Sequence, residues 1–190
     1  MNYLAHLFLA DDTPESLLGN LLGDFMKGQS IESYSDAIRQ GIRRHQQVDS
    51  FTDDHPIFRQ SKRRIHPERR RFAGVLVDIF YDHFLAIHWM QYSSIPLPQF
   101  TQHVYGVLNR HQAILPERLR KAVPAIISQD WLCSYQTLSG IDYALQRMSL
   151  RIKRANLLNE GIQDLNTHYS QLERDFKAFL PELIQYVATL

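Results

Sequence analysis

Residues 72–89 read FAGVLVDIFYDHFLAIHW, a run rich in Val, Ile, Leu, Phe and Tyr. His66-Pro67-Glu68 precedes the run, and a proline at the first helical position is typical of a helix start. We therefore expect a helix from about Pro67 to Tyr92, which at ~1.5 Å per residue would span about 40 Å. A helix this apolar is typical of the centre of a helical bundle.

Proline and glycine divide the rest of the chain at intervals that suit helices, and alternating strand patterns are absent. Thr13-Pro14-Glu15 has the N-cap, the N1 proline and the early acid of a helix start, and this helix should end between Gly23 and Gly28. Further helices are expected over about 31–53, 98–111, 116–131, 139–154 and 162–189. The sequence thus predicts an all-α fold, with residues 1–190 forming a single-domain helical bundle.

The composition excludes several classes of protein. A length of 190 residues suits one domain with a hydrophobic core, and a net charge of +1 gives no global attraction to nucleic acid or membrane. The lone Cys133 excludes a disulfide framework and a cysteine-rich zinc site. The apolar start is short, lacks a basic region and is followed by Asp11 and Asp12, so it makes a poor signal peptide. We expect a cytoplasmic protein that spans no membrane; the sequence does not reveal its oligomeric state.

Two carboxylates interrupt the apolar run. Asp78 and Asp82 are four residues apart and share one face of the expected helix. Their like charges repel each other, which is unfavourable unless a cation lies between them. His83 is about 100° farther round the helix and could reach the edge of the same site. Two interpretations fit this helix equally well. One is a metal site, and the other is a structural arrangement in which Asp82 pairs with an arginine and His83 hydrogen-bonds in the core.

A second pair, His45 and Asp49, lies one turn apart in the helix expected over 31–53. Such a pair can supply an imidazole ligand with its carboxylate partner, two metal ligands, or a simple surface ion pair. Asp24 follows Gly23, and glycines at this point let backbone or substrate come close. His6 lies on an apolar N-terminal face, where we expect a core histidine.

Together these residues offer carboxylate and imidazole ligands without thiolates. Such a set suits manganese, magnesium or iron better than a structural zinc. Ligands carried on helices are also the usual way to build a catalytic metal centre in a bundle. The candidate metal ligands are Asp24, His45, Asp49, Asp78, Asp82 and His83. The candidate catalytic residues among them are Asp24, His45, Asp78 and Asp82.

A basic cluster lies just before the apolar run, where Glu68 is the only acid between Arg59 and Arg71. A solvated face is the usual meaning of such a run, but its position beside the candidate site indicates docking of an acidic macromolecule or a phosphate-bearing ligand. Aromatic residues are not interleaved with the basic ones, so we expect no nucleic-acid partner. The residues expected to dock the partner are Arg43, Arg44, Arg63, Arg64, Arg69 and Arg70.

Over nearly its whole length the sequence resembles the acyl carrier protein phosphodiesterase family. The segments that carry the resemblance are Met1–Ala10, Gly19–Gly28, His45 with Asp49–Asp53 and His55-Pro56, and Tyr81-Asp82-His83 with Leu85-Ala86 and Trp89. The family is described as a non-standard branch of the helical His-Asp phosphohydrolases, which use a divalent metal, often manganese. Those enzymes carry His before Asp in their adjacent pair, whereas this chain has the reverse order, Asp82-His83.

The resemblance implies that the chain hydrolyses the phosphodiester between 4′-phosphopantetheine and the serine of holo-acyl carrier protein. It also implies acyl carrier protein as the partner and a divalent metal cofactor, Mn²⁺ first and Mg²⁺ or Fe²⁺ as alternatives. Two other functions stay open on the residues alone. One is metal-dependent hydrolysis of a nucleotide or another small phosphodiester, which the same chemistry would serve. The other is a non-catalytic helical interaction module, in which the Asp and His residues form structural ion pairs.

Overall fold

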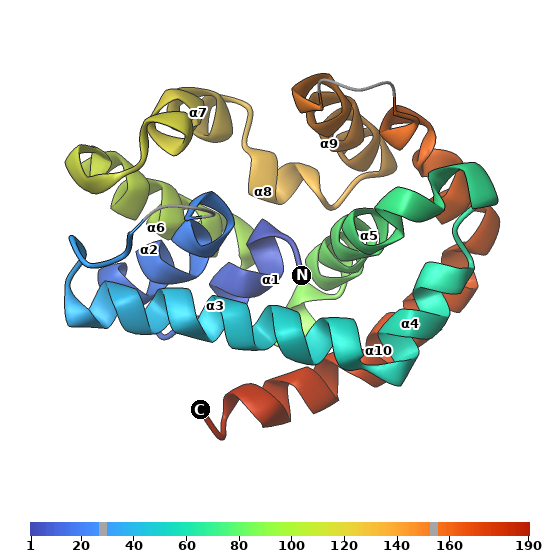
Figure 1. Ribbon diagram of the computed structural model, residues 1–190, viewed down its shortest axis with the longest axis horizontal. Helices are drawn as coiled ribbons and strands as arrows, with labels where there is room; N and C mark the ends of the chain where they lie inside the picture. Colours follow the sequence, from blue (N-terminus) through green and yellow to red (C-terminus); the bar gives the residue numbers. More distant parts are fainter. Residues whose placement is uncertain (27–29, 153–155) are drawn as a thin grey trace.

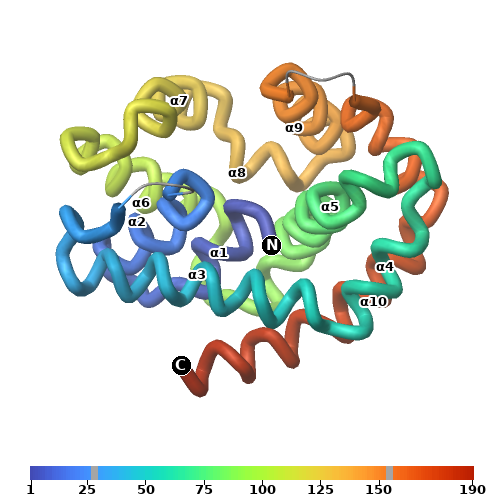
Figure 2. The backbone as a smooth tube through the Cα atoms, in the orientation of Figure 1, coloured from blue at the N-terminus to red at the C-terminus, as the bar shows by residue number. Residues whose placement is uncertain are grey.

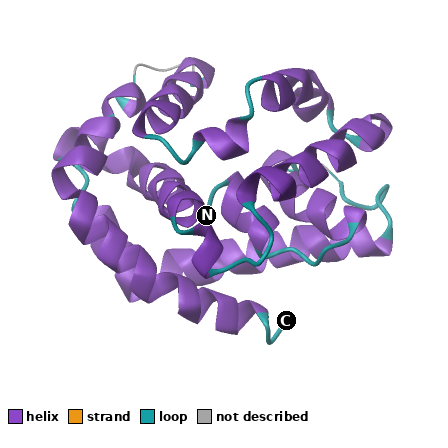
Figure 3. Ribbon diagram, turned by 180° about the vertical axis from the view of Figure 1, so that it is seen from behind, coloured by secondary structure: helices purple, strands orange, loops and turns teal. Residues whose placement is uncertain are grey.

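The computed structural model describes residues 1–26, 30–152 and 156–190, and these residues form only helices and loops (Figure 3). Along the chain the elements are α1 (Tyr3–Phe8), α2 (Pro14–Leu22), the 3₁₀ helix η1 (Gly23–Phe25), α3 (Asp36–Asp54), α4 (Pro56–Arg63), η2 (Pro67–Phe72), α5 (Ala73–Ile87), η3 (Trp89–Gln91), α6 (Leu97–Arg110), η4 (Gln112–Ile114), α7 (Glu117–Ser128), α8 (Trp131–Ser134), α9 (Leu138–Arg151), η5 (Leu158–Glu160) and α10 (Ile162–Val187). The predicted all-α fold is confirmed. In the described part of the chain, no helix combines the length and apolar character that crossing a membrane requires.

Helix α5 lies in the interior, as the apolar run predicts. Most of its side chains are buried, and α1, α4, α9 and α10 all contact it. The N-terminus of the chain lies in the middle of the molecule, between α3 and α5 (Figure 1). Helices α7, α8 and α9 lie together on the opposite side of the N-terminus from α3, and α10 runs past α4 to the C-terminus (Figure 2). This arrangement surrounds the first residues with helices on several sides.

The helix predicted from Pro67 to Tyr92 is wrong in its length, because three elements replace it. The first turns form the 3₁₀ helix η2, where Arg69 is held by ion pairs to Asp164 and Glu160. Short 3₁₀ segments are common at helix ends, and here the backbone of Phe72 leaves helical geometry before α5 begins. At the other end His88 leaves helical geometry and stops α5. Helix α10, and not the central helix, is the longest described element.

Several other predicted boundaries differ from the structure. Helix α3 starts at Asp36 and not near residue 31, because the Ser35 side chain caps it by accepting the Ile38 N–H. Helix α3 ends at Asp54, and Pro56 opens the further helix α4, as the N1 position of a helix allows. The short α1 was not predicted either. Helix α9 is described to Arg151, so the predicted end at 154 lies outside the described residues, as does Gly28.

Helices α2 and α3 pack against each other more extensively than any other pair. Glycines make this approach possible, because Gly19 on α2 faces Gly41 on α3 backbone to backbone. A Cβ added at Gly19 would collide with the Ile38 carbonyl oxygen and with the Cα of Gly41. The close approach fixes the end of α2, and η1 after it, against the middle of α3.

We expect Gly19→Ala to reduce the free energy of unfolding by about 1–3 kcal/mol, because overpacking forces two helical backbones apart. The matched control is Gly74→Ala in α5, where an added Cβ meets nothing within 4 Å. That variant should unfold at the same denaturant concentration as the wild type or a higher one, since alanine favours helix over glycine by up to about 1 kcal/mol. Urea unfolding curves test both, and equal effects of the two variants would contradict the close-packing explanation.

Candidate functional site

Four segments meet where the N-terminus lies. Helix α1 contributes His6, η1 contributes Asp24, α3 contributes His45 and Asp49, and α5 contributes Asp78. We call these five side chains and the N-terminal amine the polar cluster. The segments are far apart in the sequence, so only the folded chain brings these groups together.

The imidazole of His45 is buried and held in one orientation. Its Nδ1 lies 2.7 Å from the carbonyl oxygen of Asn20, to which it donates a hydrogen bond. The opposite nitrogen, Nε2, therefore faces the carboxylates, 3.2 Å from Asp49 Oδ2 and 3.8 Å from Asp24 Oδ1. A backbone acceptor that fixes one nitrogen and presents the other is the usual support of a metal-binding histidine.

Gly23 provides the space for the His45 ring. A Cβ added at Gly23 would fall on the imidazole itself. The backbone of Gly23 is ordinary right-handed helix, with φ −48° and ψ −42°, so its conformation does not require glycine. The sequence predicts that backbone or substrate comes close to the chain at this glycine, and in the structure it is the His45 ring that does so.

Asp49 joins the two histidines to the N-terminus. Its Oδ1 lies 3.1 Å from His6 Nε2 and 3.3 Å from the Met1 amine, while Oδ2 faces His45. Partial burial works in the opposite direction, but hydrogen bonds from both histidines and the positive amine hold the pKa of Asp49 well below its usual range. Burial alone would lower the pKa of His45, but its hydrogen bond to Asp49 and the charge of Asp24 raise it.

His6 is buried, as a core histidine should be, but its neighbours are polar. Its ring stacks on that of His45, with the ring centroids 3.7 Å apart. Its Nε2 faces two acceptors, Asp49 and the Met1 carbonyl oxygen, so this nitrogen carries the proton. The lone pair is then left on the buried Nδ1, for which the described residues supply no hydrogen-bond donor. Burial lowers the pKa of His6 to about 3.

The carboxylates of α5 both contact the N-terminal segment. Asp78 Oδ1 lies 3.0 Å from the Met1 amine, whose pKa the nearby Asp78 and Asp49 raise to about 10 despite its burial. Asp82 is fully buried and accepts the backbone N–H groups of Leu4 at 2.8 Å and Ala5 at 3.1 Å. The structure thus places Asp78 in the polar cluster and Asp82 behind it, at the start of α1.

His83 faces away from the polar cluster. Its Nδ1 donates to the Tyr135 carbonyl oxygen at 2.7 Å, and its Nε2 lies 2.9 Å from the Tyr169 hydroxyl. These partners occupy both ring nitrogens, so His83 is a hydrogen-bonded core residue, which is one of the two interpretations that its sequence position allows. The structure therefore does not bring His83 together with the other candidate ligands.

Three residues offer atoms close enough to share one ion. One possible ligand atom from each of His6, His45 and Asp49 lies within 4.8 Å of the other two. His6, which the sequence alone indicates as a core histidine, belongs to this group. No periodicity marks it, because its partners lie more than 35 residues away on α3. The orphaned Nδ1 and the mixed imidazole and carboxylate donors are compatible with a divalent ion.

A cavity of about 360 Å³ opens beside the polar cluster, and we call it the site cavity. Asp24, Asp78 and Met1 line its polar end. Its remaining walls are mainly apolar, with two arginines: Asn2, Tyr3, Phe25, Phe72, Val75, Arg118, Met148, Arg151, Ile152 and Leu158. Carboxylates at the end of a mostly apolar cavity suit a ligand with a polar reacting group and a less polar body.

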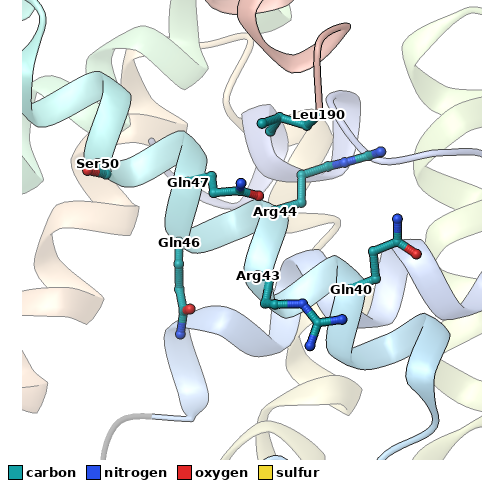
Figure 4. A pocket seen from close by; sticks show the side chains of 7 residues that line it. All are labelled: Gln40, Arg43, Arg44, Gln46, Gln47, Ser50 and Leu190. Carbon is teal, nitrogen blue, oxygen red and sulfur yellow. The ribbon is translucent and has the colours of Figure 1, made fainter.

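The arginines predicted to dock a partner differ in how free they are. Arg69 is buried with Asp164, and Arg64 is bound to Asp175. Arg63 and Arg70 are exposed. Arg43 and Arg44 line a separate pocket of about 520 Å³ on the outer face of α3, beside the C-terminal Leu190 (Figure 4). Arg44 also pairs with Asp11 at 2.8 Å.

Comparison with known proteins gives a consistent result. The sequence model of the acyl carrier protein phosphodiesterase family matches residues 1–183. Proteins of this name from Pectobacterium atrosepticum, Serratia proteamaculans and Escherichia coli O6:H1 are 37%, 39% and 35% identical to this chain. These matches cover 100%, 97% and 97% of the chain and 98%, 96% and 96% of the relatives. The chain belongs to the acyl carrier protein phosphodiesterase family. No solved structure matches it.

In this member of the acyl carrier protein phosphodiesterase family, three of the four segments that carry the sequence resemblance contribute groups to the polar cluster. Met1–Ala10 contains α1, and Gly19–Gly28 contains the end of α2 and η1. The segment around His45 and Asp49 is the middle of α3. The fourth segment, Tyr81–Trp89, runs from the second half of α5 to the start of η3 and contains Asp82, which lies behind the cluster. The family resemblance therefore covers every group of the polar cluster except Asp78.

We expect Gly23→Ala to destabilise the protein by about 1–3 kcal/mol, because the new methyl group displaces the His45 ring from its hydrogen bond to Asn20. A double-mutant cycle isolates this contact. In a His45→Ala background the same substitution should cost nothing, since the ring that it meets is gone. An equal cost in both backgrounds, measured by urea unfolding, would place the effect of Gly23 elsewhere.

Proposed function

We propose that this chain hydrolyses the phosphodiester that links 4′-phosphopantetheine to the serine of holo-acyl carrier protein. Water adds to phosphorus, the bond to the serine oxygen breaks, and the products are apo-acyl carrier protein and 4′-phosphopantetheine. The family match over residues 1–183 supports the substrate. The structure adds the observation that carries the reaction class. The carboxylates of Asp24 and Asp78 line a cavity open to a ligand, and His45, of the possible metal-binding group His6, His45 and Asp49, lies 3.8 Å from Asp24.

The polar cluster suits a divalent metal, and Mn²⁺ fits its mixed donors best, with Mg²⁺ or Fe²⁺ as alternatives. His6, His45 and Asp49 would hold it, and Asp24 and Asp78 are the carboxylates nearest to them on the cavity side. A bound metal supplies Lewis-acid polarisation of a phosphoryl oxygen and lowers the pKa of water. His45 must then present a neutral Nε2, so its proton would leave on metal binding.

The remaining residues take roles that follow from their positions. Asp24 lines the cavity with a partly exposed carboxylate, so it can accept a proton from the attacking water. Asp78 also reaches the cavity, and its position against the Met1 amine keeps that end of the cavity polar. Asp82 does not line the site cavity and is a positioning residue, which holds the backbone that carries His6.

The activity test follows the mass of holo-acyl carrier protein incubated with the purified protein and Mn²⁺. We expect loss of the phosphopantetheine group, and a fall in kcat/KM of about 100-fold or more for His45→Gln, because the imidazole contacts Asp49 and faces Asp24. His103→Gln is the matched control, since His103 is an exposed histidine paired with Asp12. A carrier that keeps its full mass under every divalent metal would rule the activity out.

The metal proposal predicts a ligand-dependent melting temperature. Mn²⁺ at 100 times its Kd should stabilise the native protein by about 2.7 kcal/mol, and EDTA should remove that gain. Asp49→Asn should lose most of the gain, because it removes the carboxylate between the two histidines. Asp54→Asn changes an exposed aspartate of the same helix, which is paired with Arg59, and should keep the gain. Identical melting with Mn²⁺ and with EDTA would contradict the metal site.

A further inference from the structure

A second cavity adjoins the site cavity. It has a volume of about 340 Å³, and it shares Tyr3, Phe25, Arg118 and Arg151 with the first. Arg118 comes from α7 and Arg151 from the end of α9, so the shared part lies between these two helices. In Figure 1 both helices lie on the side of the N-terminus away from α3. The polar cluster therefore opens to the surface between α7 and α9.

Two arginines, Arg118 and Arg151, line this opening, and Arg147 lines a smaller neighbouring cavity that shares Tyr3 and Arg151 with it. We call these three arginines the cationic rim. Arg147 lies over the rings of Trp131 and Tyr143, 4.1 Å and 4.5 Å from their centroids. Arg151 lies 5.5 Å from the Trp131 centroid. Within the described residues, no carboxylate comes within ion-pair distance of any of the three. By contrast, the neighbouring Lys121 is paired with Glu117.

Helix α9 also carries exposed apolar side chains. Leu150 on α9 is 87% exposed, and Tyr143 is 49% exposed one turn before Arg147. Arginine and aromatic residues around exposed apolar side chains are the composition typical of the energetically important part of a protein interface. An exposed leucine near arginines that have no carboxylate partner offers a binding protein both apolar and charged contacts.

We propose that the cationic rim is the surface on which acyl carrier protein docks, so that these arginines meet carboxylates of the carrier. This inference rests on the proposed function. The scissile bond is on the serine side chain, so the surface of the carrier must come within a side chain's length of the polar cluster. A docking surface must therefore border the mouth of the site cavity, and Arg118 and Arg151 of the rim do so.

The arginines that the sequence indicates as docking residues meet this requirement less well. Arg64 and Arg69 are already paired with Asp175 and Asp164. Arg43 and Arg44 line a pocket on the outer face of α3, where Arg44 is paired with Asp11, whereas His45 points into the protein from the same helix. Arginines around the mouth favour an acidic partner by charge complementarity, which mainly accelerates encounter and fixes orientation.

The experiment compares Arg118→Glu/Arg151→Glu with Arg43→Glu/Arg63→Glu, which makes the same change of charge away from the opening. Binding of apo-acyl carrier protein and of holo-acyl carrier protein is measured by fluorescence anisotropy at two salt concentrations. We expect the rim variant to weaken binding of both carriers by at least tenfold, with a smaller dependence on salt. The control variant should stay within about twofold of the wild type.

The apo-carrier lacks 4′-phosphopantetheine, called the arm here, and therefore lacks its phosphate. Its binding reports contacts with the carrier surface alone. Loss confined to the holo-carrier would overturn the proposal in favour of arginines that bind the arm. Loss in the control variant and not in the rim variant would overturn it in favour of the basic stretch. Arg118→Gln/Arg151→Gln, with the melting temperature measured, guards against misfolding: a folded neutral variant with wild-type affinity also overturns it. A carrier that binds through the rim but is not hydrolysed would leave the docking surface intact and refute the proposed function.

Discussion

The buried carboxylate of Asp82 holds the first helix in place, and the polar cluster depends on this contact. Helix α1 has six residues, too few to be stable by itself. Its first N–H groups have no partner within the helix, and two of them point at Asp82, where the positive end of the helix dipole favours a negative charge. Burial nevertheless raises the pKa of this carboxyl to about 7, although the two hydrogen bonds act in the opposite direction. The central helix thus fixes where Met1 and His6 lie.

A second constraint acts from the other side of the cluster, through the glycines of α2 and η1. Gly19 lets α2 approach the backbone of α3, and Gly23 leaves room for an imidazole instead of a side chain of its own. His45 is consequently held by the Asn20 carbonyl group and presents a defined nitrogen to the carboxylates. Two longer helices thus position two short N-terminal segments. Helix α5 holds α1 through hydrogen bonds to Asp82, and α3 packs closely against η1 and the end of α2 because glycines there leave room.

The sequence predicts what depends on local spacing. The helical class, the interior position of α5 and the pairing of His45 with Asp49 all follow from three- and four-residue intervals. Other features depend on contacts between distant segments, and spacing does not reveal them. His6 meets His45 across the fold, so its apolar surroundings in the sequence indicate only a core residue. Asp82 and His83 are neighbours, yet one meets α1 and the other meets Tyr135 and Tyr169, because adjacent residues of a helix point in different directions. The break before α5 reflects Arg69, whose partners lie near residue 160.

The polar cluster and the cationic rim come from different parts of the chain. Every group of the cluster precedes residue 79, whereas the arginines of the rim and the exposed Tyr143 and Leu150 lie between residues 118 and 151. Substitutions in the second half can change which surface fits against the opening without touching a group that performs chemistry. Substitutions in the first half can change the chemistry behind an unaltered opening. The architecture therefore allows partner selection and bond cleavage to diverge independently among related proteins.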